Sequence, residues 1–315
     1  MILTKPNGLT LEELVKSATM FYIDEELERE FSNAVTASVE KIRSNLVGVA
    51  MLDGLSKYIK EDKEALHLIT SLLNISEEKF KRVVTMLRIQ KNYIPTSEWT
   101  LLNIRKQMLE SADFMQEICE LLSNGANLDK YKTKIPAFYL ENFNIDTSTL
   151  GRLANVDDVR RLVKKGLEGR YSNKIGDSFF KFVTDYITSV CEHEGLTYSV
   201  KKDVPLVGRS MSVAIPDVDN PRLLIDIAYL ITTSSTQTKD AESAEKAAAI
   251  IRKHNSNKEE ENHIVFINIV EGAGWIARQS DLRKIERCSD YFLNLKSLDV
   301  IKNIINYYFN GGVSQ

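Results

Sequence analysis

Two apolar runs in the second half of the chain limit the folds that it can adopt. Residues 222–232 (RLLIDIAYLIT) and 263–270 (HIVFINIV) are almost continuously hydrophobic, which is typical of strands buried in the middle of a sheet. Residues 239–254, which lie between these runs, are rich in alanine and predict a helix. Because a helix commonly joins two parallel strands, the three segments predict the centre of a sheet with parallel pairing.

The flanking segments extend this sheet. Short strands are expected at 196–201, 211–216 and 290–295, and helices at 174–194, 279–287 and 297–309. The resulting order is helix, three strands, helix, strand, helix, strand, helix. Three strands in succession suggest an antiparallel meander, to which the later strands add in parallel.

The first half of the chain has a different pattern, because its apolar residues recur at helical spacing. Helices are expected at about 10–21, 24–44, 46–60, 63–73, 76–90, 97–109 and 111–123, followed by a linker at 124–150. The 315 residues exceed the ~100–200 of an average domain. We therefore expect an all-α domain at 1–150 and an α/β domain, with a mixed sheet flanked by helices, at 151–315.

The composition excludes several classes of protein. Hydrophobic residues make up 43% of the chain and charged residues 27%, which excludes a wholly disordered or collagen-like chain. No uncharged apolar run reaches the ~18 residues that a membrane helix needs, and the first residues do not resemble a secretory signal. Three separated cysteines fit neither a disulfide framework nor a zinc motif, so a cytoplasmic protein without a membrane partner is expected.

Three segments carry a resemblance to a known group of nucleases. They are KIGDSFFKFVTDYI (174–187), SVAIPDVDNPRLLIDIAYLITTSSTQTKDAESAEKA (212–247) and VFINIVEGAGWIARQSDLRKIERCSDYFLNL (265–295). In order, they resemble the opening helix, the catalytic hairpin with its Thr/Ser-Gln turn, and the following strand, loop, helix and closing strand of type II restriction enzymes. These enzymes belong to the restriction-endonuclease-like, or PD-(D/E)xK, superfamily. The resemblance covers about residues 150–309.

The resemblance implies a metal site on the hairpin. The family places one carboxylate on each strand, and a lysine two residues after the second carboxylate. Pairing about a turn centred near Asp219 puts Asp226 opposite Ser212, so Asp226 is the best candidate for a Mg²⁺ ligand. Ser212 and Ala228 stand where the family has the first carboxylate and the lysine, and the opening helix lacks the family's Glu near Phe179. The catalytic motif is therefore degenerate at these positions.

Other residues could complete the site. Asp217, which follows Pro216, is a second candidate metal ligand, and turn chemistry is the alternative explanation for its position. Lys239 could bring its ammonium group from the next helix, although a solvated helix start is the favoured explanation for it. Gln237 could orient water or a phosphate.

Basic residues could contact DNA, but with a net charge of −3 such a surface must be local. Residues 152–174 carry seven basic and three acidic side chains, which suits phosphate contact. Residues 79–95 predict a second basic helix, with Arg88 reading a base. The alternative in each case is a solvated helix face. The candidates are Arg160, Arg161, Lys164, Lys165, Lys174, Arg82, Arg88, Lys91 and Arg278.

These features predict a sequence-specific endonuclease for double-stranded DNA, a type II restriction enzyme or a subunit of one, with Mg²⁺ as cofactor. Because two-fold symmetric DNA sites favour protein dimers, a homodimer is expected, with the helical half serving recognition and dimerisation. The alternative is a catalytically silent DNA-binding or assembly subunit with a degenerate nuclease fold. An unrelated α/β enzyme is disfavoured because no phosphate-binding loop or nucleophile motif is present.

Overall fold

The computed structural model describes residues 4–47, 51–90, 97–233 and 235–310. The chain divides into two compact units. The sheet unit consists of Met1–Glu25 and Ser172–Gln315, and the helical unit of Glu26–Tyr171. The structure thus divides the chain differently from the predicted 1–150 and 151–315, because the helical unit is an insertion that separates two parts of the sheet unit.

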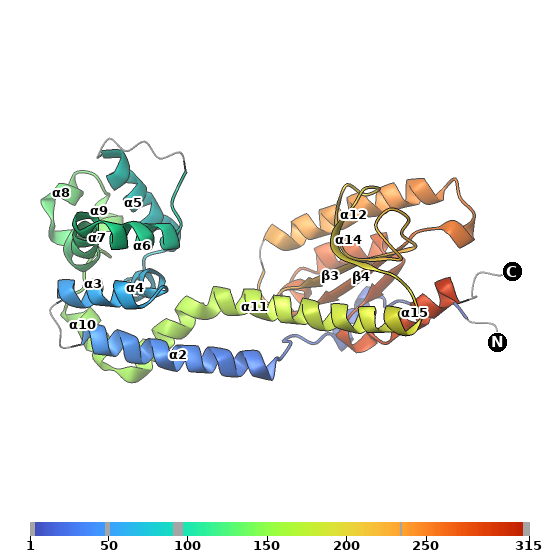
Figure 1. Cartoon of the computed structure of the whole chain (residues 1–315), viewed down its shortest axis with the longest axis horizontal. Helices are drawn as coiled ribbons and strands as arrows, with labels where there is room; N and C mark the ends of the chain where they lie inside the picture. Colours follow the sequence, from blue (N-terminus) through green and yellow to red (C-terminus); the bar gives the residue numbers. More distant parts are fainter. Residues whose placement is uncertain (1–3, 48–50, 91–96, 234, 311–315) are drawn as a thin grey trace. The chain divides into compact units, whose positions relative to one another are not determined.

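A five-stranded sheet forms the centre of the sheet unit (Figure 1). Its strands, in spatial as in chain order, are β1 (Ser199–Val204), β2 (Arg209–Ile215), β3 (Leu223–Tyr229), β4 (Val265–Glu271) and β5 (Tyr291–Leu293). The first three strands pair antiparallel, and β3, β4 and β5 pair parallel. The predicted meander with parallel additions is therefore confirmed.

Helices cover both faces of this sheet. The helices of the sheet unit are α1 (Leu11–Ser17), the second half of α11 (Val156–His193), α12 (Ser235–Asn255), α13 (Ala273–Ile276), α14 (Gln279–Cys288) and α15 (Val300–Phe309), with 3₁₀ turns at Glu260–Asn262 and Leu295–Ser297. Figure 1 shows α12 on one side of the strands and α11 on the other.

Successive side chains of a strand point to opposite faces of the sheet, so a hydrophobic core forms on each face. Ile225 and Ile267 pack in the core that includes Phe179 and Val183 of α11 and residues of α15. The neighbours Leu224 and Phe266 point the other way, into the core that includes residues of α12 and α14. The continuous apolar runs seen in the sequence are explained by this burial on both faces.

The first residues of the chain belong to the sheet unit because they bond to its last elements. The Leu9 amide donates to the Phe292 carbonyl of β5 (2.8 Å), and the Leu11 amide donates to Oε1 of Glu286 on α14 (2.6 Å). A capping box between Thr10 and Glu13 begins α1, as predicted. Leu14 then enters the core beside α12 and α14. Helical spacing predicts such an apolar face, but not the element that it contacts.

The helical unit contains helices of 4 to 22 residues in addition to the first half of α11. They are α2 (Glu25–Leu46), α3 (Met51–Glu61), α4 (Ala65–Leu72), α5 (Glu77–Gln90), α6 (Leu101–Glu110), α7 (Ala112–Asn124), α8 (Asp129–Lys132), α9 (Ala137–Leu140) and α10 (Thr147–Ala154), with a 3₁₀ turn at Gly125–Asn127. The all-helical prediction is confirmed here, and the expected linker at 124–150 contains three short helices. Among the described helices, none is both long and apolar enough to cross a membrane.

Candidate active site

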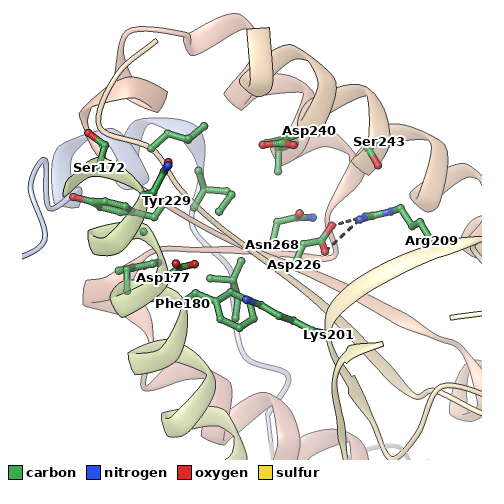
Figure 2. Close-up of a pocket in the computed structure, with 18 residues that line it drawn as sticks. Ser172, Asp177, Phe180, Lys201, Arg209, Asp226, Tyr229, Asp240, Ser243 and Asn268 are labelled. Carbon is green, nitrogen blue, oxygen red and sulfur yellow. Dashed lines mark hydrogen bonds and ion pairs between the residues drawn. The ribbon is translucent and has the colours of Figure 1, made fainter. Parts of the chain in front are cut away.

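A cavity of about 640 Å³ opens beside the central strand β3 (Figure 2). Its walls come from α11, β1, β2, β3, α12, β4 and α14, so side chains far apart in the sequence meet there. Asp226 stands in the middle of the lining, with Asn268 beside it on β4. This is the place in the fold where the sequence predicted a site.

The register of the hairpin brings Ser212 and Asp226 together. Strand β2 pairs with β3 through Val213 with Ile225 and Ala214 with Leu224, and the next pair in this register is Ser212 with Asp226. Ser212 Oγ accepts a hydrogen bond from the backbone amide of Ile227 at 3.0 Å. The predicted register is therefore confirmed, and the Ser212 hydroxyl forms a hydrogen bond with the backbone of β3.

Arg209, the first residue of β2, forms an ion pair with Asp226. One guanidinium nitrogen lies 3.4 Å from Oδ1 of the carboxylate, and the other contacts Oδ2 (Figure 2). The two side chains are only 25% and 21% exposed. The ion pair is thus partly shielded from solvent, and Arg209 neutralises the carboxylate that was predicted as a metal ligand. Arg209 was not predicted, because the family's motif contains carboxylates and a lysine but no arginine paired with a carboxylate.

Asp240 of α12 is a second carboxylate at this cavity. Burial and, to a smaller extent, the negative charge of Asp226 raise its pKa to about 6, while the positive charge of Arg209 opposes the rise. The residue predicted to reach the site from this helix was its neighbour Lys239. Successive residues of a helix point about 100° apart, so Asp240 can line the cavity while Lys239 is exposed to solvent.

Two further charged residues line the cavity from other elements. Asp177 lies on α11, so the opening helix has an acid here although it lacks the family's Glu. Lys201 lies on β1, and its ammonium nitrogen is 4.0 Å from the ring centre of Phe180 on α11 (Figure 2). Neither residue was predicted, because only the tertiary fold brings α11 and β1 to the hairpin.

Three predicted residues lie elsewhere. Asp217 is in the turn after β2, where Oδ1 accepts hydrogen bonds from the backbone amides of Asp219 (2.9 Å) and Asn220 (2.7 Å). It does not line the cavity, and the turn explanation accounts for its position. Gln237 is buried, and its Nε2 donates to the Thr232 carbonyl at 2.9 Å, which holds the loop that enters α12. Catalytic roles for Asp217, Gln237 and Lys239 stay predictions.

Arg278 and Lys174 belong to the sheet unit. Arg278 follows the glycine-containing loop and donates to Thr238 Oγ1 at 3.1 Å, while its Nε lies 3.5 Å from Asp281. These contacts join the start of α12 to α14, so Arg278 has a clear structural role. Lys174 is exposed on α11.

The basic residues of the helical unit fall into two groups. Arg160, Lys164 and Lys165 line a groove of about 520 Å³ between α2 and α11. Arg161 pairs with Asp158 (2.8 Å), and Arg82 pairs with Glu98 (2.9 Å). The first group is therefore the better candidate for a DNA contact.

Arg88 corrects a prediction. It is 6% exposed, and its guanidinium carbon lies 3.3 Å from the ring centre of Trp99. Arg88 is thus a buried residue of the helical unit and not part of a surface that could read a base. Lys91, predicted in the same basic stretch of helix and following turn, lies outside the described residues.

Comparison with known families agrees with this geometry. Residues 159–309 match a family described as the BanI C-terminal domain, which is the C-terminal domain of a restriction endonuclease. This part of the chain is therefore similar to a domain of type II restriction endonucleases. The match begins within α11 and ends with α15, so it contains every strand and the whole cavity. No curated protein matched the chain in a separate search.

The side chains that line the cavity can be tested for their fit to a magnesium ion. Among the described residues, no three His, Cys, Asp or Glu side chains are gathered as a complete metal site. Mg²⁺ is usually held by one or two carboxylates, with water and substrate phosphate as its other ligands. Asp226 and Asp240 line one cavity and interact electrostatically, so they fit this kind of site once Arg209 moves away from Asp226.

Proposed function

We propose that this chain is a site-specific endonuclease that hydrolyses double-stranded DNA at the cavity of the sheet unit, with Mg²⁺ as its cofactor. The match to a restriction endonuclease domain supports the class of function. The observation that carries the proposal is that two carboxylates, Asp226 and Asp240, line one cavity beside the hairpin. A strand as apolar as β3 would otherwise gain little from a carboxylate at its centre.

Asp226 and Asp240 would hold the metal ion. A bound Mg²⁺ supplies a Lewis acid for the phosphate and lowers the pKa of a coordinated water. In the hydrolysis, the oxygen of water bonds to phosphorus, one P–O ester bond breaks, and the departing oxygen takes up a proton. The side chains of the cavity orient the phosphate, and the walls formed by α11 and α12 limit the access of other water.

The helical unit would contribute to DNA binding. Arg160, Lys164 and Lys165 share one groove, and this spacing suits contact with a phosphate backbone. We further propose that the chain acts as a homodimer, because two-fold symmetric DNA sites favour two-fold symmetric proteins.

A second candidate function is favoured by one specific observation. Arg209 forms an ion pair with Asp226. In addition, Ser212 and Ala228 stand where the family's motif has a carboxylate and a lysine. An arginine in this position competes with a cation for the carboxylate. A DNA-binding subunit without catalytic activity would retain the same fold and the same groove.

A plasmid cleavage assay with Mg²⁺ or Mn²⁺ decides between the two functions. The nuclease proposal predicts discrete fragments from the wild-type protein, none from Asp226→Ala, and normal cleavage by Asp203→Asn. Asp203 lies on β1 and is exposed outside the cavity, so it controls for the loss of one negative charge. Intact plasmid with every variant, together with a salt-sensitive gel shift, would favour the silent subunit.

A further inference from the structure

Lys201 has an unusual backbone conformation for its place in a strand. Its φ is +48°, although its neighbours Val200 and Lys202 keep one regular register with Val213 and Met211 of β2. The left-handed region is unfavourable for a residue with a Cβ atom, and it persists only where the surrounding structure imposes it. A glycine would adopt this conformation without cost, so the lysine at this position calls for an explanation.

The side chain of Lys201 explains the position. It lines the cavity that contains Asp226, whereas that of Lys202, the next residue, does not. The ammonium nitrogen lies 4.0 Å from the ring centre of Phe180. Figure 2 shows the two side chains next to each other. An aromatic face attracts an ammonium group but leaves its charge uncancelled.

The two basic side chains of the cavity, Arg209 and Lys201, therefore differ in their partners. Arg209 is bound to Asp226. Lys201 has no carboxylate within ion-pair distance among the described residues, so its charge is available to an anion that enters the cavity. Lysine is a common ligand of phosphate, which it binds as a compact point charge.

We propose that Lys201 contacts the phosphate group that enters this cavity, and so supplies from β1 a positive charge that Ala228 on β3 cannot supply. The inference rests on the proposed nuclease function, in which that phosphate is the phosphodiester to be cut. Lys201 lies on β1, outside the hairpin formed by β2 and β3. Its left-handed backbone conformation then lowers the stability of the protein but places the ammonium group where it can contact the substrate.

Chemical modification of lysines tests this contact without relying on cleavage. The full-length protein is acetylated with and without genomic DNA fragments, in the absence of divalent ions, and the modified peptides are quantified by mass spectrometry. We expect DNA to slow modification of Lys201 severalfold, and to slow that of Lys202 less. Equal reactivity of Lys201 with and without DNA, under conditions where DNA is bound, would overturn the proposal.

The variant Lys201→Gly separates this role from a structural one. Because glycine accepts the left-handed backbone, we expect a melting temperature equal to or above that of the wild type. Cleavage should fall about 100-fold, the range of a lost charge contact in a transition state, while Lys202→Gly cleaves within about threefold of the wild type. Wild-type cleavage by a stable Lys201→Gly would refute the contact.

The two tests also distinguish failure of the inference from failure of the proposed function. If the wild-type protein does not cleave DNA, the nuclease proposal fails, and the acetylation experiment alone decides whether Lys201 contacts phosphate. If the wild type cleaves and DNA does not protect Lys201, the nuclease proposal stands and the inference fails.

Discussion

The sheet unit and the helical unit use their charged residues in different ways. In the sheet unit, the partly buried Asp226, Asp240 and Arg209 meet at one cavity, where the charges of Asp226 and Arg209 act on Asp240. In the helical unit, Lys164 and Lys165 are exposed to solvent in a groove. Charges are costly to gather away from solvent, so a partly buried cluster of both signs indicates chemistry, whereas neighbouring exposed basic side chains suit contact with a polyanion. The first unit should therefore set the rate of cleavage and the second the affinity for DNA.

The largest effect is expected from Asp240. Changing it to Asn removes one of two carboxylates that would hold the metal ion, and we expect cleavage to fall at least about 100-fold, because metal coordination stabilises the transition state by several kcal/mol. The affinity for DNA should change little. Gel shifts and cleavage rates on the same DNA measure both quantities. Cleavage at the wild-type rate would show that Asp240 is not a ligand, and would leave its raised pKa as a consequence of burial and of the nearby charge of Asp226.

The groove of the helical unit should govern salt dependence. With Arg160, Lys164 and Lys165 all changed to Ala, the slope of log K against log salt should become shallower by about 2.7 if each residue neutralises one phosphate. A matched variant replaces Lys57, Lys106 and Lys132. These lysines lie on other helices of this unit, and each pairs with an acid on its own helix. This control removes the same charge. If both variants shift the slope equally, the effect belongs to net charge and not to the groove.

Arg209 should compete with a metal ion for the carboxylate of Asp226. With Arg209→Gln, Asp226 loses its bound cation, so we expect Mn²⁺ to bind the DNA-free protein up to about tenfold more tightly, in keeping with a pair worth roughly 1 kcal/mol. Isothermal titration calorimetry measures this affinity. Asp226→Asn provides the opposite control, since it removes the carboxylate itself. Weaker Mn²⁺ binding by Arg209→Gln would contradict competition between the arginine and the metal.

The smallest effect on function is expected from Arg88. Its guanidinium is buried against Trp99, so Arg88→Ala should destabilise the protein by about 1–3 kcal/mol through lost packing. DNA affinity at a temperature where the variant is folded should be unchanged. Thermal unfolding and gel shifts test the two parts. A stable variant with weakened binding at one base pair would restore the base-reading role predicted from the sequence.

The sequence predicted the sheet better than it predicted the site. Apolar runs and turn residues are local signals, and they gave the strand order and the pairing that sets Asp226 beside Ser212. Asp240 and Lys201 were missed because no local pattern says which side chains of α12 and of β1 line the cavity beside β3. Only packing decides those contacts.

The same limit applies to the helical unit. The basic pattern of 79–95 suggested an exposed face, but Arg88 is covered by Trp99, a residue eleven positions later in the chain. The insertion of the whole unit was missed for a related reason. Leu9, just before α1, bonds to β5, and Leu11, the first residue of α1, bonds to α14; both partners lie more than 270 residues away in sequence.

A single-turnover experiment tests the division between the two units most directly. Cleavage is measured with the protein in large excess over DNA, at low salt and with Mg²⁺, so that weak binding no longer limits the rate. We predict that the triple variant of Arg160, Lys164 and Lys165 then cleaves at nearly the wild-type rate, while Asp226→Asn stays inactive at every protein concentration. Recovery of Asp226→Asn at high concentration, or a triple variant that stays inactive when all DNA is bound, would contradict the account.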